Sequence, residues 1–342
     1  MQIQELTDKE RYSPLWKTQA GHILQSWQWG EIKRGAWQPL RLELEHAGES
    51  RVMTILVRKL PVLGIKVGYC PRITFPQNLE SDTLESLRAF VKANDNCDFV
   101  LLESDYTDTN LPQVLKESGR IDYSVQPACS NRVDLQKSEQ ELWGNLKGSY
   151  RRNINKADRQ GVVIREITEG SLALDQFYDV MADIFKNTSY VMHSKDYFGR
   201  VWQKLTEAGL AKIFLAEQNG RIVGAYLVAY DENVAYEFYG GVTQAGRDVE
   251  AGYQLKWKAM LDARQMGKKF YDHWGVAPRL ENGEYDPKHE LGNISNFKAG
   301  FGGTDICFAK TVALVISAPK YKLFKFLLKL QALNIGLRKI VR

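Results

Sequence analysis

One order of helices and strands occurs twice along this chain of 342 residues, and the repetition limits the folds it can adopt. Hydrophobic periodicity in the first stretch predicts a helix at 26–34, strands at 40–45, 51–58 and 64–69, a helix at 82–93 and a strand at 99–102. In the second it predicts helices at 175–185 and 195–208, strands at 211–218, 222–230 and 234–239, a helix at 253–265 and a strand at 269–274. Turns are expected at Ala47–Gly48 and at Asn219–Gly220, the latter a strong hairpin signal.

Duplication of one α/β unit explains this repetition better than coincidence, although an unrelated pair of α+β domains is the alternative. The element order predicts an α/β fold with mixed sheets, in which two GNAT-like acyl-N-acyltransferase domains lie in tandem. A sharp change in charge near Lys147 suggests the boundary. We therefore expect a first domain at 1–146, completed by residues 310–342, and a second domain at 147–309. No heptad-bearing insert is visible, so no coiled-coil arm is expected.

Composition indicates a folded protein of the cytoplasm. Hydrophobic residues make up 44% of the chain and aromatic residues 11%, which supports a sizeable core. The first ten residues are charged and lack the apolar centre of a signal peptide, and no run reaches the ~18 apolar residues of a membrane span. The cysteines at 70, 97, 129 and 307 lie far apart, so we expect neither a disulfide framework nor a metal site.

Two segments concentrate positive charge. Between Lys147 and Arg165 the only acid is Asp158, and the chain from Pro319 onward has no acid at all. The first segment could follow the phosphates of an RNA or form a solvated helix face. The second places lysines on one helical face and apolar residues on others, so it could pack on the first domain or contact a membrane surface or nucleic acid. Packing is the simpler interpretation.

Six stretches, in order, resemble the motifs of one protein family. They are Gln25-Ser26-Trp27-Gln28-Trp29 with Lys33, Tyr69-Cys70-Pro71-Arg72, the bridge Gln126–Leu142, Ser149–Glu166, Asp272-His273-Trp274-Gly275, and Asn296-Phe297-Lys298-Ala299-Gly300-Phe301-Gly302-Gly303. The chain is similar over 25–322 to the FemABX family of tRNA-dependent aminoacyltransferases. The resemblance implies two GNAT-like domains and transfer of an amino acid from aminoacyl-tRNA to the stem-peptide amine of a peptidoglycan precursor.

The resemblance also implies partners and an assembly. The co-substrate is aminoacyl-tRNA, no other cofactor is needed, and the acceptor is UDP-MurNAc-pentapeptide or lipid II. Without an arm, the chain looks more like the compact members that add the first residue of a cross-bridge. We expect a monomer in the cytoplasm, with peripheral contact at the inner membrane face as an open alternative.

A catalytic lysine is expected at Lys298. Aminolysis of an ester passes through a tetrahedral oxyanion that a positive charge can stabilise. Lys298 matches the family's catalytic lysine and Phe297 the aromatic beside it, in a loop whose glycines would let the backbone approach the substrate. The alternative is a tight turn with a solvated lysine. Asp105 could take the proton of the attacking amine or could be a turn or cap residue, and a route through the ribose and phosphate of the tRNA is equally open.

Five residues are expected to bind substrate. Lys33 matches a family lysine that contacts phosphate, Arg72 ends the matching strand, and Tyr197 and Tyr239 look like substrate-contacting tyrosines. His193 stands where compact members carry an arginine, and histidine binds phosphate more weakly at neutral pH. This departure leaves a lipid-linked acceptor open. Ordinary roles for these residues are an exposed lysine and buried, hydrogen-bonded tyrosines.

The family's need for tRNA gives the first basic segment a role. We expect its cations to contact the acceptor stem through Lys147, Arg151, Arg152 and Lys156.

Two other functions compete. An acyl-CoA-dependent N-acyltransferase of the GNAT class would need a pyrophosphate loop, and the nearest candidate, Gln244–Gly252, carries acids where phosphate would bind. A basic RNA-binding protein would share the charge clusters but would leave the glycine-flanked Lys298 unexplained.

Overall fold

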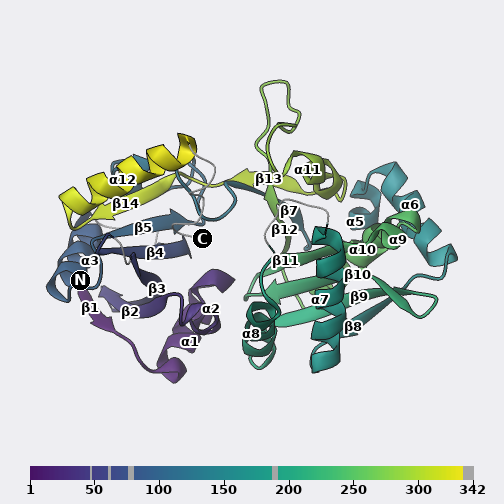
Figure 1. Ribbon diagram of the computed structural model, residues 1–342, viewed down its shortest axis with the longest axis horizontal. Helices are drawn as coiled ribbons and strands as arrows, with labels where there is room; N and C mark the ends of the chain where they lie inside the picture. Colours follow the sequence, from purple (N-terminus) through teal and green to yellow (C-terminus); the bar gives the residue numbers. More distant parts are fainter. Residues whose placement is uncertain (47, 61–62, 76–80, 187–191, 334–342) are drawn as a thin grey trace. The chain divides into compact units, whose positions relative to one another are not determined.

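A computed structural model describes the chain except residues 47, 61–62, 76–80, 187–191 and 334–342 (Figure 1). Half of the turn expected at Ala47–Gly48 therefore lies outside the described residues. The chain folds as two compact units. Unit 1 joins Met1–Ala128 to the chain from Phe308 onward, and unit 2 spans Cys129–Cys307.

Unit 1 contains a seven-stranded sheet in the order β1-β2-β3-β4-β5-β14-β6. Its strands are β1 (Gln2–Glu5), β2 (Gln38–His46), β3 (Glu49–Leu60), β4 (Ile65–Ile73), β5 (Phe99–Ser104), β6 (Arg120–Ile121) and β14 (Thr311–Val315). All neighbours are antiparallel except β4 and β5, which run parallel.

Unit 2 repeats this sheet. Its order is β13-β7-β12-β11-β10-β9-β8, and the one parallel pair, β11 with β12, again stands in the same place. The strands are β7 (Cys129–Asp134), β8 (Val163–Ile167), β9 (Ala211–Gln218), β10 (Arg221–Tyr230), β11 (Val234–Val242), β12 (Phe270–Val276) and β13 (Thr304–Cys307). The predicted duplication and the GNAT-like tandem fold are thus confirmed.

The helices follow the same repeat. Between the first two strands of each sheet lie α1 (Lys9–Thr18), η1 (Ile23–Gln25) and α2 (Trp27–Lys33) in unit 1, and α7 (Ser171–Phe185) and α8 (Lys195–Thr206) in unit 2. Before the second strand of each parallel pair lie α3 (Ser81–Ala93), and α9 (Gln244–Asp248) with α10 (Ala251–Gln265). The remaining helices are α4 (Gln113–Lys116), α5 (Glu139–Asn145), α6 (Gly148–Arg159), α11 (Gly292–Ala299) and α12 (Ala318–Leu333).

The units divide earlier than the expected boundary after residue 146. The segment from Cys129 to Leu146 belongs to unit 2 because β7 pairs antiparallel with both β12 and β13. Ser138 begins α5 with a capping box that includes Glu141. The change in charge at Lys147 marks the start of α6 inside unit 2, since charge reports solvent exposure and not strand pairing.

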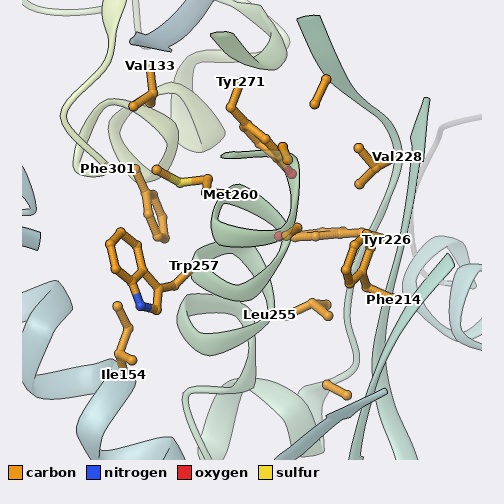
Figure 2. Packing of buried hydrophobic residues seen from close by; sticks show 14 of the residues in the cluster. Val133, Ile154, Phe214, Tyr226, Val228, Leu255, Trp257, Met260, Tyr271 and Phe301 are labelled. Atoms are coloured by element: carbon orange, nitrogen blue, oxygen red, sulfur yellow. The ribbon is translucent and has the colours of Figure 1, made fainter. Parts of the chain in front are cut away.

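Helix α10 forms the centre of the unit 2 core (Figure 2). Leu255, Ala259 and Met260 are fully buried, and Trp257 is 5% exposed beside Phe301. Apolar residues lie on more than one side of α10, so the helix packs between the sheet and α6. Burial of this kind is the main source of the unit's stability.

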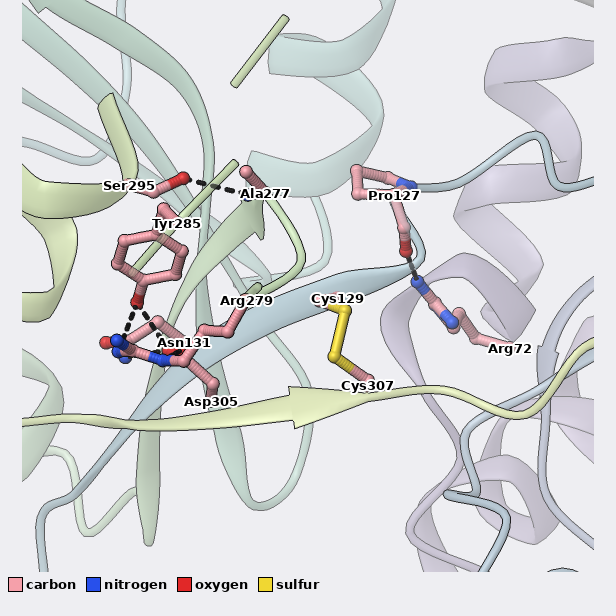
Figure 3. The surroundings of a disulfide bond; sticks show 10 residues. All are labelled: Arg72, Pro127, Cys129, Asn131, Ala277, Arg279, Tyr285, Ser295, Asp305 and Cys307. Atoms are coloured by element: carbon pink, nitrogen blue, oxygen red, sulfur yellow. Dashed lines mark hydrogen bonds and ion pairs between the residues drawn. A yellow bond between two sulfur atoms is a disulfide. The ribbon is translucent and has the colours of Figure 1, made fainter. Parts of the chain in front are cut away.

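The structure contradicts the expectation of no disulfide (Figure 3). Cys129 and Cys307 are joined by a disulfide although they lie 178 positions apart in the sequence. Strand pairing brings them together, because Cys307 of β13 faces Cys129 of β7 in the antiparallel register. Spacing along the sequence gives no sign of such a cross-strand pair.

The C-terminal helix α12 packs on the unit 1 sheet. The Phe324 ring is fully buried with its centroid 4.7 Å from that of Phe99, and Lys320 Nζ lies 3.0 Å from Asp98 Oδ1. Its other side is open, with Phe326 57% exposed. No helix within the described parts of the chain is both long and apolar enough to cross a bilayer.

Candidate active site

The two parallel strands of unit 2 part and leave a cavity. Pairing of β11 with β12 covers Val234–Tyr236 against Phe270–Asp272 and goes no further, although both strands continue. Beyond this point a cavity of about 500 Å³ opens. It is lined by Ile184, Tyr226, Glu237, Gly240, Gly241, Val242, Arg247, Glu250, Gly252, Tyr253, Lys256, Ile294, Phe297 and Lys298. A largely apolar cavity with a few charged groups is the usual form of a small-molecule site.

Helix α11 supplies the lysine of the site. We expected Lys298 in a glycine-flanked loop, but it lies in the last turn of this helix, and Ile294, Phe297 and Lys298 line the cavity together. Their spacing of three and four residues explains this, because such positions share a helix face. Lys298 is 7% exposed, and its Nζ donates to the Gly275 carbonyl at 2.7 Å.

The glycines after Lys298 serve packing within the protein. A Cβ at Gly300 would collide with the Tyr150 ring, and a Cβ at Gly303 would collide with the Asn131 side chain. The expectation that these glycines admit substrate is therefore corrected: they let the end of α11 lie against α6 and β7. The spacing of glycines in a sequence does not tell which atoms will approach them.

Burial changes the chemistry of Lys298. Desolvation lowers the pKa of its amine to about 8, while the negative charge of Glu237 opposes the shift. An amine with this pKa is largely a cation at neutral pH and can still exchange a proton. It can therefore stabilise a developing oxyanion in a cavity where water screens charge weakly.

Three residues that we did not predict lie in or beside this site. Glu237 and Lys256 line the cavity with their charged atoms 2.5 Å apart, and the His273 ring, fully buried, places Nδ1 3.3 Å from Lys256 Nζ. Burial lowers the pKa of His273 to about 4, with Lys256 contributing, so the ring is neutral at pH 7. The available signal was a charged residue inside an apolar run, as at Glu237 in Val234–Val242.

Three of the predicted substrate-binding residues meet in unit 2. The hydroxyls of Tyr197, on α8, and Tyr239, on β11, lie 3.2 Å apart. The His193 ring stacks on Tyr197 with the ring centroids 4.1 Å apart. The cluster combines a buried tyrosine with an exposed histidine, so a ligand could reach it from solvent.

Three other predicted residues lie in unit 1. Lys33 ends α2, with its Nζ 4.7 Å from the centroid of the Trp29 ring. Arg72 is 6% exposed, and its guanidinium donates to the Pro127 carbonyl at 2.6 Å (Figure 3). The guanidinium also lies 3.5 Å from the centroid of the Phe308 ring. Asp105 follows β5, and its backbone N–H donates to the Ile73 carbonyl at 3.1 Å, one residue beyond Arg72.

The predicted tRNA-binding residues differ in their surroundings. Lys147 and Arg152 are exposed at the start of α6. Arg151 instead donates to the carbonyls of Trp143, Gly144 and Leu146, the last carbonyls of α5. Lys156 pairs with Glu250 at 3.0 Å. Two of the four cations therefore have partners within the protein.

The tandem sheets, each with one parallel pair, define the class of fold as two GNAT-type acyltransferase domains. The sequence profile of the acetyltransferase (GNAT) domain family matches residues 144–283, within unit 2. The chain is similar to the crystal structure of FemX with a TM-score of 0.80 and 17% identity, over 95% of this chain and 100% of that one. The resemblance to FemABX is thus confirmed at the level of the fold.

Other solved structures are more distant. L-PGS from Bacillus licheniformis gives a TM-score of 0.56 and 15% identity, over 96% of this chain and 98% of that one. A tandem GNAT protein from the clavulanic acid biosynthesis pathway gives 0.54 and 11%, over 92% and 98%. No curated protein matches the chain. These likenesses establish the fold, and the reaction has to be inferred from the residues of the site.

Proposed function

We propose that this protein transfers an amino acid from aminoacyl-tRNA to the stem-peptide amine of a peptidoglycan precursor, UDP-MurNAc-pentapeptide or lipid II. The observation that carries the proposal is Lys298, a buried amine at the parting of two parallel strands, in a cavity of about 500 Å³. The chain shares its fold with FemX, and this likeness supports the proposal.

The proposed reaction is aminolysis of an ester. The acceptor nitrogen attacks the aminoacyl carbonyl, a C–N bond forms, and the C–O bond to the ribose of the tRNA breaks. The carbonyl oxygen carries negative charge in between, and Lys298 meets it as a cation with Phe297 beside it. The proton of the amine passes to the leaving ribose oxygen, by a route through the ribose and phosphate of the tRNA themselves.

The acceptor carries phosphate in either form, and unit 1 offers Lys33 and Arg72 for its polar groups. His193 stacks on Tyr197 beside Tyr239, where the resemblance would place an arginine, and this departure leaves the lipid-linked form open. A lipid-linked acceptor also gives a role to α12, whose exposed side carries Lys322, Lys325, Lys329, Leu323 and Phe326. We propose that this side contacts the anionic membrane surface.

The donor tRNA would lie along the start of α6. Lys147 and Arg152 are exposed there, Arg159 is exposed at the other end of the helix, and phosphates attract such cations irrespective of sequence.

The alternative is acyl transfer from acyl-CoA. It is a candidate because the acetyltransferase (GNAT) domain profile matches unit 2. A pyrophosphate would bind at the start of α10, after β11. Glu250 stands at that position and lines the cavity, with Lys156 as its partner. A carboxylate at the helix N-terminus repels phosphate, so the geometry disfavours this donor.

The deciding experiment compares donors. Purified protein is incubated with a pool of charged tRNAs or with acetyl-CoA, together with UDP-MurNAc-pentapeptide or lipid II, and the products are analysed by mass spectrometry. We expect an aminoacylated muropeptide only with charged tRNA. When phosphatidylglycerol is offered as an acceptor instead, we expect no aminoacyl-phosphatidylglycerol. Acetylated product from acetyl-CoA alone would contradict the proposal.

A further inference from the structure

Three charged side chains from three elements converge on the cavity of unit 2. Glu237 comes from β11, Lys256 from α10 and Lys298 from α11. Lys256 is fully buried and Lys298 is 7% exposed. Burying a charge is costly unless an opposite charge or hydrogen bonds compensate it, and two amines share one carboxylate here.

The carboxylate is held in place from two sides. Lys256 Nζ donates to Glu237 Oε2 at 2.5 Å, and the Tyr271 hydroxyl donates to the same oxygen at 3.1 Å. Burial by itself would raise the pKa of Glu237, but Lys256, His273 and Lys298 together outweigh it and the pKa falls to about 2. Glu237 is therefore ionised throughout the physiological range.

Lys298 has no such direct partner among the described residues. Its Nζ donates to the Gly275 carbonyl, a neutral acceptor. The charged groups that act on it come from the surrounding elements: Glu237 on β11 and Asp272 on β12 favour its protonated form, and Lys256 on α10 opposes it. Asp272 is already engaged by Arg132 at 2.6 Å, and the nearby His273 is neutral at pH 7.

We propose that Glu237 is a positioning residue that keeps Lys298 protonated inside the cavity, so that Lys298 meets the reacting oxygen as a cation. Lys256 and Tyr271 hold the carboxylate in place for that purpose. This inference rests on the proposed function, because protonation of Lys298 matters only if the cavity is the site of transfer.

The electrostatics require a carboxylate at this point. Without Glu237, the amines of Lys256 and Lys298 would repel each other in a region from which water is largely excluded. At least one amine would lose its proton near neutral pH, since desolvation already lowers the pKa of both. The carboxylate opposes this loss of a proton at Lys298, the lysine proposed to face the substrate.

The titration of Lys298 can be measured without any substrate. The full-length protein is treated with acetic anhydride over a pH series, and mass spectrometry gives the acetylation rate of each lysine. Lys258, exposed on the same helix as Lys256, is the internal reference. We expect a midpoint of about 8 for Lys298 in the wild type. In Glu237→Gln the midpoint should fall by about one pH unit or more, with that of Lys258 unchanged.

In a second variant, the titration midpoint of Lys298 should shift in the opposite direction. Lys256→Met removes the cation that opposes protonation of Lys298, so its midpoint should rise. Lys258→Met is the matched control and should move nothing. If Glu237→Gln fails to fold by circular dichroism, Lys256→Met decides alone. An unchanged midpoint in the folded Glu237→Gln variant, or a fall in Lys256→Met, would overturn the inference.

Transfer assays then separate this inference from the proposed function. The alkaline limb of the single-turnover rate should shift to lower pH in Glu237→Gln by the same amount as the titration. If the titration shifts but the wild type transfers nothing from charged tRNA, the proposed function is wrong and the electrostatic role of Glu237 stands. If transfer occurs and Lys298 titrates identically in both proteins, the role of Glu237 is wrong.

Discussion

Units 1 and 2 share one strand order, yet only in unit 2 does the parallel pair open. In unit 1, β4 and β5 pair from Val67 with Phe99 to Cys70 with Leu102 and, after a shift of register, again at Ile73 with Ser104, and the chain beyond stays linked through Asp105. In unit 2, the pairing of β11 with β12 ends at Tyr236 and Asp272. The cavity of about 500 Å³ lies beyond that point, whereas the cavity beside Arg72 in unit 1 is about 130 Å³.

This contrast bears on where chemistry can arise in a duplicated fold. Both units place buried charge near the ends of the parallel strands, Glu103 in unit 1 and Glu237 in unit 2. Tyr69 donates to Glu103 at 2.7 Å, and Glu103 lines only the smaller cavity of about 130 Å³, whereas Glu237 lines the larger one with Lys256 and Lys298. We propose that unit 2 performs the reaction and that Lys33 of unit 1 contributes to acceptor binding.

The largest expected effect is on Lys298. Lys298→Ala removes the cation that meets the oxyanion and should lower the single-turnover transfer rate by about a hundredfold or more. Binding of the acceptor and the thermal midpoint should change little. Lys258→Ala, an exposed lysine of the same unit, is the control and should keep the wild-type rate. A Lys298→Ala enzyme with near-wild-type turnover would mean that the cavity does not perform the chemistry.

The pH dependence should follow the same amine. The pKa of Lys298 is lowered to about 8, so the cation is present below that pH and is lost as the pH rises through it. The single-turnover rate should therefore fall about tenfold per pH unit above 8. Lys298→Arg, slower at neutral pH, should lose this alkaline limb because guanidinium stays charged. A rate that rises through pH 8 would make Lys298 a base.

The exposed cations of α6 should set the affinity for tRNA. Replacing Lys147, Arg152 and Arg159 by Ala should weaken binding and reduce the slope of log K against log salt by roughly 0.7–0.9 for each phosphate that is no longer neutralised. Arg151 is left in place because it caps α5. Three exposed lysines of unit 1, Lys9, Lys17 and Lys92, form the charge-matched control. Equal slopes for both triple variants would make α6 a solvated surface.

Lys33 should affect the acceptor and not the chemical step. Lys33→Ala should raise the apparent acceptor constant several-fold, about 1 kcal/mol, if its amine contacts a phosphate. The rate at saturating acceptor should stay near wild type. Lys17→Ala on α1 is the matched control. A fall in the saturated rate would contradict the separation of roles between the units.

The smallest effect is expected on the open side of α12. The double variant Lys325→Ala with Phe326→Ser should weaken binding to vesicles that contain phosphatidylglycerol. Loss of the lysine should cost about 1 kcal/mol of binding free energy, and loss of the ring somewhat more. The thermal midpoint should not change. Phe324→Ala on the same helix is the contrast. It should destabilise unit 1 by roughly 3–5 kcal/mol, because that ring is buried against Phe99. Unchanged vesicle binding would leave α12 a packing element alone.

The sequence predicted the repeat well because strand and helix periodicities are local. The helix expected at 82–93 became Ser81–Ala93, and the strand expected at 211–218 was confirmed with both ends. Tyr197 and Tyr239 were chosen by resemblance, and the structure brings them into contact. The division at Cys129 was missed because it depends on a pairing between strands far apart in the sequence.

The site was harder to predict. Lys298 was predicted in a loop because glycines follow it in the sequence. The helix itself is short, and its apolar face gives only a weak periodic signal. Glu237 and Lys256 were missed because neither residue by itself marks a site in the sequence. Tertiary packing alone places their charged atoms 2.5 Å apart. The disulfide escaped for the same reason, since it needs the register of β7 against β13.

The most direct test is a crystal structure of the protein with a stable donor analogue, an RNA acceptor stem whose terminal ribose carries the amino acid through an amide. The account predicts that the aminoacyl carbonyl lies in the cavity of unit 2, with its oxygen about 3 Å from Lys298 Nζ. An aminoacyl group bound in unit 1, or in unit 2 away from Lys298, would contradict it.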